Sequence, residues 1–354
     1  MTRATLAPDD ALPPLHGIVP PWPGVEERLD GAITYVRRTP ASAPGAEPAL
    51  YVHGLGGSSL NWTDLAALLA DRLDGEAIDL PGFGFSDPAP RYSLDAMAAR
   101  VVRWIEHSGR GPVHLFGNSL GGTIAVRVAA TRPDLVRSLT LISPALPFLD
   151  PRRSVHSRLL PLLLVPGADR IATRRMASVD PAELARQVIA ACFAEPQLLP
   201  EQRLAEAVEE VRRRYEVPWY ARAYLGTMRS LISSFVRAYL PGAGSMWRIA
   251  ARITAPTLVI SGRLDRIVDI RSAPILGRLI PDSRMLLLDG VGHVAQMEQP
   301  RLVARAFVSL LADTVSGVSL VADTGSGVTL LGDAMSGGFT SGVSTRPGPS
   351  PVAG

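Results

Sequence analysis

The serine in Gly117-Asn118-Ser119-Leu120-Gly121 is the residue of this chain best suited to nucleophilic chemistry. The pentapeptide follows the apolar run at residues 113–116 and precedes a helix-like segment. A G-x-S-x-G pattern between a strand and a helix predicts a nucleophile elbow, a turn that lifts the serine hydroxyl clear of the backbone. A serine in that strained turn needs small neighbours two residues away on each side, and Gly117 and Gly121 fill both positions.

A serine hydroxyl becomes a nucleophile when a neighbouring base accepts its proton and an acid orients that base. Among the histidines, His53 and His293 directly follow predicted strands, where parallel sheets gather catalytic groups. His293 lies in a glycine-rich loop after the last predicted strand and is the predicted base. The acid should also follow a strand. We predict Asp265 for this role, with Asp269, close to the next helix, as the alternative.

Acyl chemistry at a serine also needs two backbone N–H donors that stabilise the oxyanion. One is the N–H of Leu120, directly after the serine. The other is expected in His53-Gly54-Leu55-Gly56-Gly57, where glycines such as Gly54 let the backbone approach a substrate, and Leu55 is the predicted donor. His53 itself is expected to hold this loop by hydrogen bonds. The scheme requires no cofactor and no metal.

The elements that must position these residues follow an alternating pattern. We predict a hairpin over residues 27–39 that turns at Asp30-Gly31, and strands over residues 49–52, 76–80, 113–116, 138–142, 257–261 and 284–288. Helices are predicted over residues 62–73, 93–107, 270–280 and 301–312. Strands that alternate with helices predict an α/β fold with a mostly parallel central sheet flanked by helices.

The domain organisation follows from where this alternation stops and resumes. Residues 1–24 are predicted to be an extended leader, and residues 25–145 and 251–312 one α/β core. Residues 146–250 are predicted to be a helical cap or lid inserted between the sixth and seventh strands. Residues 313–354 hold a degenerate ten-residue repeat and a Pro/Gly/Ser end, which predict a flexible low-complexity tail, with a β-like stack or an interaction arm as the alternative.

The order Ser119, Asp265, His293, with a cap between strands, resembles the α/β-hydrolase superfamily over residues 25–312. Two further motifs carry the resemblance, Asp79-Leu80-Pro81-Gly82-Phe83-Gly84-Phe85-Ser86 and His293-Val294-Ala295-Gln296-Met297-Glu298-Gln299-Pro300. The resemblance implies a Ser-Asp-His triad. In it, Asp79 and Gly84 shape a loop and do not act as catalysts.

The elbow narrows the reaction class within that superfamily. A serine at the nucleophile position argues against haloalkane dehalogenases and epoxide hydrolases, which use aspartate there. The elbow resembles both monoacylglycerol-lipase-like esterases and the C–C hydrolases of meta-cleavage pathways. The C–C hydrolases commonly carry tryptophan where this chain has Val294 and Met297. We therefore expect a carboxylic-ester hydrolase, with a C–C hydrolase or a cofactor-free oxygenase or perhydrolase as alternatives. A non-catalytic receptor is disfavoured because all three triad positions are filled.

Composition limits the partners. A hydrophobic fraction of 47% with 19% charged residues is typical of a globular core, and a net charge of +3 without a basic aromatic run argues against nucleic acid. The single Cys192, in an apolar helical stretch, predicts an inert thiol and no internal disulfide. No secretory signal or membrane-length apolar run is found, so a cytoplasmic protein is expected. Its partner is expected to be a small hydrophobic ester.

The leucine-rich residues 159–165, flanked by arginines, leave open a peripheral contact of the cap with lipid. The alternative is an ordinary cap helix that buries its leucines. The oligomeric state is not predicted.

Overall fold

The computed structural model describes residues 1–15, 17–147, 170–171, 178–240 and 245–323. Residues 1–314 form one compact unit and residues 315–354 form another. The segment 159–165, for which the sequence leaves open either a lipid contact or an ordinary cap helix, lies outside the described residues, as does the tail beyond residue 323. None of the described helices is long and apolar enough to cross a membrane.

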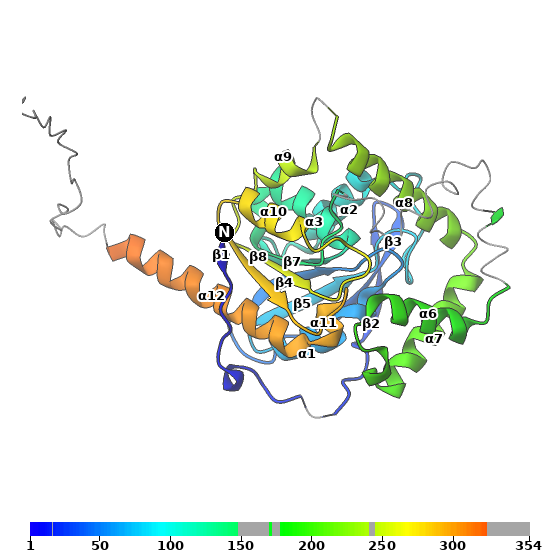
Figure 1. Ribbon diagram of the computed structural model, residues 1–354, viewed down its shortest axis with the longest axis horizontal. Helices are drawn as coiled ribbons and strands as arrows, with labels where there is room; N and C mark the ends of the chain where they lie inside the picture. Colours follow the sequence, from blue (N-terminus) through cyan, green and yellow to red (C-terminus); the bar gives the residue numbers. More distant parts are fainter. Residues whose placement is uncertain (16, 148–169, 172–177, 241–244, 324–354) are drawn as a thin grey trace, which may run out of the picture. The chain divides into compact units, whose positions relative to one another are not determined.

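A nine-stranded sheet forms the centre of residues 1–314 (Figure 1). Its strands are β1 (Thr2–Arg3), β2 (Gly24–Leu29), β3 (Ala32–Thr39), β4 (Glu47–Val52), β5 (Leu73–Ile78), β6 (Val113–Asn118), β7 (Val136–Ile142), β8 (Thr257–Gly262) and β9 (Ser283–Leu288). They lie in the order β1-β9-β8-β7-β6-β4-β5-β3-β2. Strand β3 pairs antiparallel with β2 and with β5, and the other pairs are parallel. The predicted mostly parallel sheet is confirmed.

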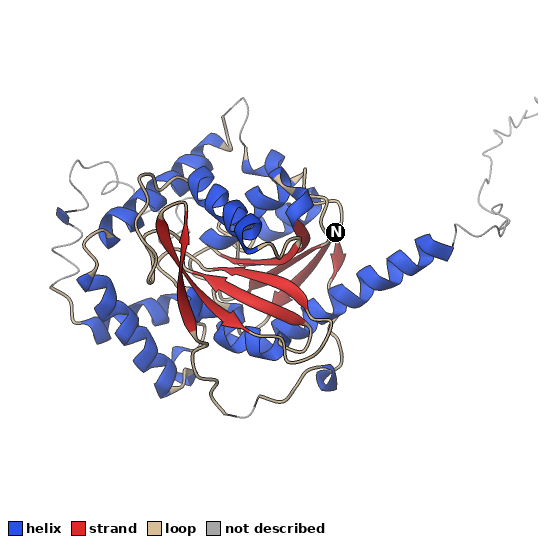
Figure 2. Ribbon diagram, turned by 180° about the vertical axis from the view of Figure 1, so that it is seen from behind, coloured by secondary structure: helices blue, strands red, loops and turns tan. Residues whose placement is uncertain are grey.

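Helices cover both faces of this sheet (Figure 2). They are α1 (Thr63–Leu69), α2 (Leu94–Ser108), α3 (Leu120–Thr131), α6 (Pro181–Cys192), α7 (Glu201–Glu216), α8 (Tyr220–Arg237), α9 (Met246–Ala250), α10 (Ser272–Leu279), α11 (Ala295–Glu298) and α12 (Pro300–Asp323), joined by 3-10 turns at Asp9–Ala11, Ser59–Trp62, Pro133–Leu135 and Pro196–Leu198. One buried cluster joins the sheet to α2, α3, α8, α9 and α10, and a second joins its other face to α1 and α12.

Local signals explain where several elements begin and turn. Asp30 and Gly31 have φ values of 52° and 79°, as a type I′ turn requires, so the predicted hairpin is confirmed. Ser93 caps α2 by accepting a hydrogen bond from the Ala96 N–H at 3.1 Å. Leu94 and Met97 of that helix are buried, as the apolar spacing predicts.

Some boundaries differ from the sequence-based expectation. The helix predicted over residues 62–73 ends at Leu69, because Leu73 already pairs with Glu47 in the parallel β4–β5 ladder. The final helix, expected to end at residue 312, runs on to Asp323. Residues 1–24, expected as an extended leader, contribute β1, which pairs with β9, and bury Ala4 and Leu12.

The helical insertion lies between β7 and β8. It was expected between the sixth and seventh strands, and the count changes because the sequence pattern did not show the two-residue β1. Its described helices are α6, α7, α8 and α9. Helix α8 packs into the core cluster through Leu231 and Phe235, whereas α6 contributes Ile189 to a separate small cluster with Phe193 and Val294. The insertion therefore reaches the histidine loop that follows β9.

Candidate active site

Ser119 occupies a strained turn between β6 and α3. Its φ of 53° and ψ of −116° are unusual for a residue with a side chain, and the turn is held at both of its backbone ends. The Ser119 N–H donates to the Ile142 carbonyl at 3.0 Å, and the Ser119 carbonyl accepts from the Thr123 and Ala145 N–H groups. Neighbouring elements thus fix the conformation that a nucleophile elbow requires.

Glycine is needed at the elbow because a side chain there would collide with neighbouring elements as well as with the turn itself. A Cβ atom on Gly117 would lie 2.5 Å from the Gly121 carbonyl oxygen, and one on Gly121 would lie 2.1 Å from the Val52 carbonyl oxygen of β4. A Cβ atom on Gly54 would approach the Ser119 Cβ atom to 3.2 Å. These glycines let β4, the loop after it and the first turn of α3 come together around Ser119.

His293 and Asp265 are in direct contact. The Nδ1 atom of His293 lies 2.8 Å from Oδ2 of Asp265, and the two side chains are 5% and 1% exposed. Burial alone would raise the pKa of Asp265. The facing His293 and hydrogen bonds from the Ile267 and Val268 N–H groups outweigh burial and hold that pKa below its usual value. Asp265 is therefore an ionised acceptor that orients the imidazole through its Nδ1–H.

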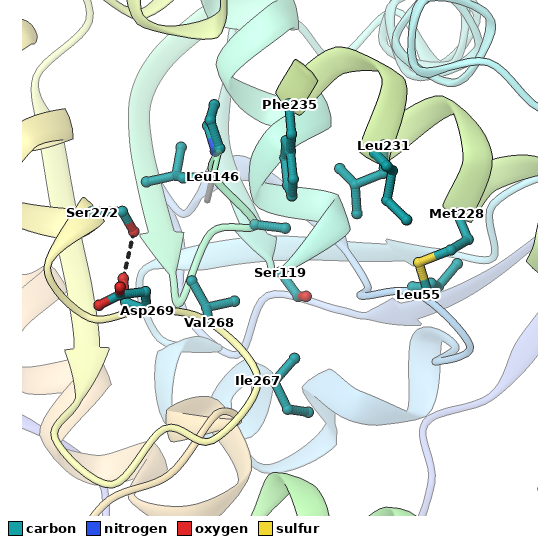
Figure 3. A pocket seen from close by; sticks show the side chains of 13 residues that line it. Leu55, Ser119, Leu146, Met228, Leu231, Phe235, Ile267, Val268, Asp269 and Ser272 are labelled. Atoms are coloured by element: carbon teal, nitrogen blue, oxygen red, sulfur yellow. Dashed lines mark hydrogen bonds between the residues drawn. The ribbon is translucent and has the colours of Figure 1, made fainter. Parts of the chain in front are cut away.

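Asp269, the alternative acid, is engaged elsewhere. Its carboxylate forms an ion pair with Arg271 and accepts a hydrogen bond from the Arg271 N–H at 3.1 Å. The Asp269 carbonyl accepts from the Ser272 hydroxyl at 2.6 Å, the contact drawn in Figure 3. The structure therefore pairs Asp265, and not Asp269, with the histidine.

His53 braces the glycine-rich loop after β4, as expected. Its Nε2 atom accepts from the Leu80 N–H at 2.9 Å, so Nδ1 carries the proton and donates to the Gly54 carbonyl at 2.7 Å. Burial lowers the pKa of His53, which favours this neutral form. Asp79 accepts from the Ser59 N–H at 2.7 Å, which ties the neighbouring loops together. The loop-shaping role expected for Asp79 agrees with this contact.

The backbone N–H groups of the two predicted oxyanion donors, Leu55 and Leu120, make no hydrogen bond to the described part of the protein. Leu120 is the first residue of α3, where an N–H has no partner within its helix. Leu55 lies in the glycine-rich loop. Within the part of the chain that the structure describes, neither N–H donates to a protein acceptor. Both are available to a developing negative charge, and the positive end of the α3 dipole adds to this potential.

Ser119 lies in the lining of two pockets. Figure 3 shows its hydroxyl pointing into an apolar pocket whose walls include Leu55, Met228, Leu231, Phe235, Ile267 and Val268. The second pocket contains His293 and Asn118 as well as Ser119, with Arg214 and Glu210 of α7 and apolar residues of α6. Leu55 and Ile267 line both pockets, so the serine stands where the two meet. We call the second one the polar pocket, because its otherwise mostly apolar lining includes Arg214, Glu210 and His293.

Two positioning residues were not identified from the sequence. The Asn118 side-chain amide donates to the Ile142 and His293 carbonyls, each at 3.1 Å, and so links the elbow to the histidine loop. The Glu298 carboxylate accepts from the Gly292 N–H at 2.9 Å and from the Ala194 N–H at 2.8 Å. The sequence signals that could have identified them are the position of Asn118 next to Ser119 and the position of Glu298 five residues after His293.

The C-terminal end of α6 therefore touches the histidine loop through its backbone. The His293 N–H donates to the Cys192 carbonyl at 2.7 Å, and a Cβ atom on Gly292 would lie 2.5 Å from that same oxygen. Cys192 also lines the polar pocket, and burial raises the pKa of its thiol to about 12. This agrees with the expected inert thiol. No cluster of potential metal ligands occurs among the described residues.

Comparisons with known proteins agree with this architecture. A family model for the alpha/beta hydrolase fold matches residues 48–300. The rat monoacylglycerol lipase ABHD6 is 29% identical over 280 residues, which cover 76% of this chain and 77% of that protein. The dihydrolipoyllysine-residue acetyltransferase component of the acetoin cleaving system of Pseudomonas putida is 29% identical, over 75% of this chain and 64% of that protein.

Solved structures show the same fold. A putative lipase from Acinetobacter baumannii superposes with a TM-score of 0.66 at 23% identity, over 83% of this chain and 92% of that chain. The meta-cleavage product hydrolase CumD from Pseudomonas fluorescens has a TM-score of 0.62 at 18% identity, over 80% of this chain and 96% of that chain. The fold is thus shared by a protein described as a putative lipase and by one described as a meta-cleavage product hydrolase.

Proposed function

Because the chain belongs to the alpha/beta hydrolase fold family, we propose that it hydrolyses carboxylic esters of apolar acyl groups, with Ser119 as the nucleophile. The observation that carries the proposal is the 2.8 Å contact between His293 and Asp265, from a histidine that lines the same pocket as the strained Ser119. The monoacylglycerol lipases among the relatives support ester hydrolysis in general.

The proposed reaction has two halves. Ser119 Oγ attacks the acyl carbon while His293 Nε2 takes the hydroxyl proton, and Asp265 stabilises the imidazolium. The N–H groups of Leu55 and Leu120 bind the oxyanion. As the C–O bond breaks, His293 returns the proton to the leaving alcohol. Water then attacks the acyl-enzyme with His293 again as base, which releases the acid and restores Ser119.

The apolar pocket supports the proposed acyl preference. Met228, Leu231 and Phe235 of α8 face the Ser119 hydroxyl in Figure 3. Burial of a methylene group against such side chains contributes about 0.8 kcal/mol, so a longer acyl chain should bind more tightly until the pocket is filled. We also propose that the insertion contacts a lipid surface peripherally, which would give the enzyme access to such esters.

The test is labelling with a fluorophosphonate, followed by turnover of p-nitrophenyl esters of graded acyl length. Ser119→Ala should lose both labelling and turnover. Ser272→Ala is the matched control, because that serine lines the same apolar pocket but donates its hydroxyl proton to the Asp269 carbonyl. Equal labelling of Ser119→Ala and the wild type would refute the nucleophile. Preferred cleavage of a dienoate C–C bond would replace the ester assignment with the C–C hydrolase alternative.

A further inference from the structure

Arg214 and Glu210 bring an ion pair into the polar pocket beside Ser119. Among the described residues that line this pocket, they are the arginine and carboxylate side chains. The Arg214 Nη2 atom lies 3.1 Å from Glu210 Oε1, and the two side chains are 15% and 13% exposed. Most surface ion pairs are open to solvent on several sides. This pair is instead largely withdrawn from water, and it lines both the pocket that contains Ser119 and a neighbouring pocket that contains Arg213 and Glu209.

Helix α7, which carries the pair, is held in place by contacts near both of its ends. Near the N-terminal end, Arg203 donates to Asp64 at 2.6 Å and to the Val19 carbonyl at 2.7 Å. Near the C-terminal end, the Arg213 guanidinium lies over the Phe85 ring, 3.3 Å from its centroid. These contacts with α1 and with the loop after β5 anchor the helix to the core. Arg214 and Glu210 are therefore presented to the pocket in a fixed orientation.

Both side chains of the pair line the pocket, but the pair itself occupies one oxygen of the carboxylate. Glu210 Oε1 faces Arg214 and is buried, so a ligand in the pocket cannot reach this oxygen. The ion pair engages one nitrogen of Arg214, which has five N–H donors, and the Glu210 carboxylate has a second oxygen that can accept. The pocket thus offers guanidinium donors beside a carboxylate.

The charges of the pair select the type of ligand group. A carboxylate or phosphate would be attracted by Arg214 and repelled by Glu210, and a cation would meet the reverse. A hydroxyl group suits both side chains, because it can accept from the guanidinium and donate to the carboxylate. Hence the pair is complementary to an uncharged, hydroxylated group.

The position of His293 indicates which half of an ester meets this pair. His293 must protonate the leaving oxygen, and it lines the polar pocket with Arg214 and Glu210. It is not among the described residues that line the apolar pocket. The leaving alcohol therefore belongs on the polar side, and the acyl group on the side of Leu231 and Phe235. This step rests on the function proposed above.

We propose that the Arg214–Glu210 pair is the leaving-group subsite of this enzyme and selects esters whose alcohol carries free hydroxyl groups. The two side chains bind those hydroxyls in the Michaelis complex and take no part in bond breaking. They are specificity-determining residues, and their loss changes the ranking of alcohols without changing the ranking of acyl groups.

The test compares three butanoate esters that share one acyl group: propyl butanoate, 1-butanoylglycerol and butanoylglycolate. The wild type should turn over the glycerol ester with a kcat/KM about tenfold or more above that of the propyl ester, the size expected for hydrogen bonds to charged groups. In Glu210→Leu/Arg214→Met this ratio should fall toward one. Both partners are replaced together because a single change would strand a buried charge.

A matched control lies on the same helix. Arg212 and Glu209 form an exposed pair at 3.4 Å, with side chains 62% and 72% exposed, so Glu209→Gln/Arg212→Gln should leave the alcohol ranking as in the wild type. Arg214→Lys keeps the charge but loses the planar fork, and it should lower the ratio in part. A thermal melt checks that each variant is folded.

Several outcomes would overturn the subsite. One is an unchanged ratio in the folded double variant, and another is a wild-type preference for the glycolate ester. If the double variant does not fold, a wild-type ratio below about two decides against the subsite on its own. Turnover that survives Ser119→Ala would instead refute the proposed function. Ser119-dependent turnover without alcohol discrimination would refute the subsite alone.

Discussion

Ser119 shows how much of a site can be encoded within a few residues. Its positive φ, 53°, is tolerated because Gly117 and Gly121 remove the Cβ atoms that would collide with the neighbouring backbone. The choice between Asp265 and Asp269 cannot be made from local sequence, because both residues follow the same strand. It was decided by the 2.8 Å contact that brings Asp265 to His293.

A prediction at this scale concerns those two carboxylates. Asp265→Asn should lower kcat for ester hydrolysis by about 10⁴-fold, because an asparagine can leave the imidazole in the wrong tautomer and cannot stabilise the imidazolium. Steady-state kinetics near pH 8 would measure the loss. Asp269→Asn is the control, since that carboxylate pairs with Arg271, and it should stay within a few-fold of the wild type. A larger loss in Asp269→Asn than in Asp265→Asn would reverse the assignment of the acid.

At the scale of elements, the inserted helices and the histidine loop form one hydrogen-bonded assembly. The Glu298 carboxylate spans from Gly292, just before His293, to Ala194, just after α6. Burial raises the pKa of Glu298, although the N–H groups that it accepts from act in the opposite direction. The position of α6 and the position of His293 are therefore coupled through one side chain.

This coupling makes Glu298 a positioning residue with a measurable effect. Glu298→Ala leaves the Gly292 and Ala194 N–H groups without this acceptor and should lower kcat by about tenfold or more, because small displacements of a catalytic group are costly. Glu298→Gln keeps one acceptor oxygen and should recover part of that loss. KM should change less than kcat, since Glu298 does not line either pocket. The exposed Glu209→Ala is the control, and a kcat for Glu298→Ala equal to that control would exclude the coupling.

At the scale of the whole molecule, the sheet separates two hydrophobic cores and buries histidines whose charged form is disfavoured. His53 and His114 are 0% and 1% exposed, and burial lowers the pKa of both. In the unfolded chain these imidazoles become protonated as the pH falls through about 6.5, whereas in the folded chain they stay neutral to lower pH. The stability that the two neutral histidines allow is thus fully present above about pH 6.5 and is lost as the pH falls below that value.

Urea unfolding at pH 7.0, 6.5, 6.0 and 5.5 would measure this dependence. The free energy of unfolding should decline across the lower part of this range, with a slope of at most about 1.4 kcal/mol per pH unit for each histidine. His53→Asn removes one of the two groups and should show a shallower slope. Burial raises the pKa of Asp79 and Glu298, which acts in the opposite direction at lower pH, so the comparison of slopes carries the test. Identical slopes would contradict the account of His53.

The elbow, the mostly parallel α/β sheet and the loops that carry Ser119 and His293 can be predicted from the sequence alone. Those features depend on local sterics and on the periodicity of apolar residues, which can be recognised without knowing distant contacts. The sequence pattern missed β1, whose two residues are too short to show a pattern and exist as a strand only beside β9. It also placed the end of α1 too late, because pairing with β4 overrides the helical spacing near Leu73.

Contacts between segments far apart in the chain became visible only in the folded molecule, because they depend on how the elements pack. The fold pairs Asp265 with His293, ties Glu298 to the end of α6, and brings Arg214 and Glu210 to the polar pocket. In the sequence, Glu210 and Arg214 are four residues apart and the exposed Glu209 and Arg212 three apart, and both spacings can bring opposite charges together on a helix. Which pair faces a substrate depends on the rotation of α7 against the core. That rotation is set by Arg203 and Arg213, whose partners lie in other elements.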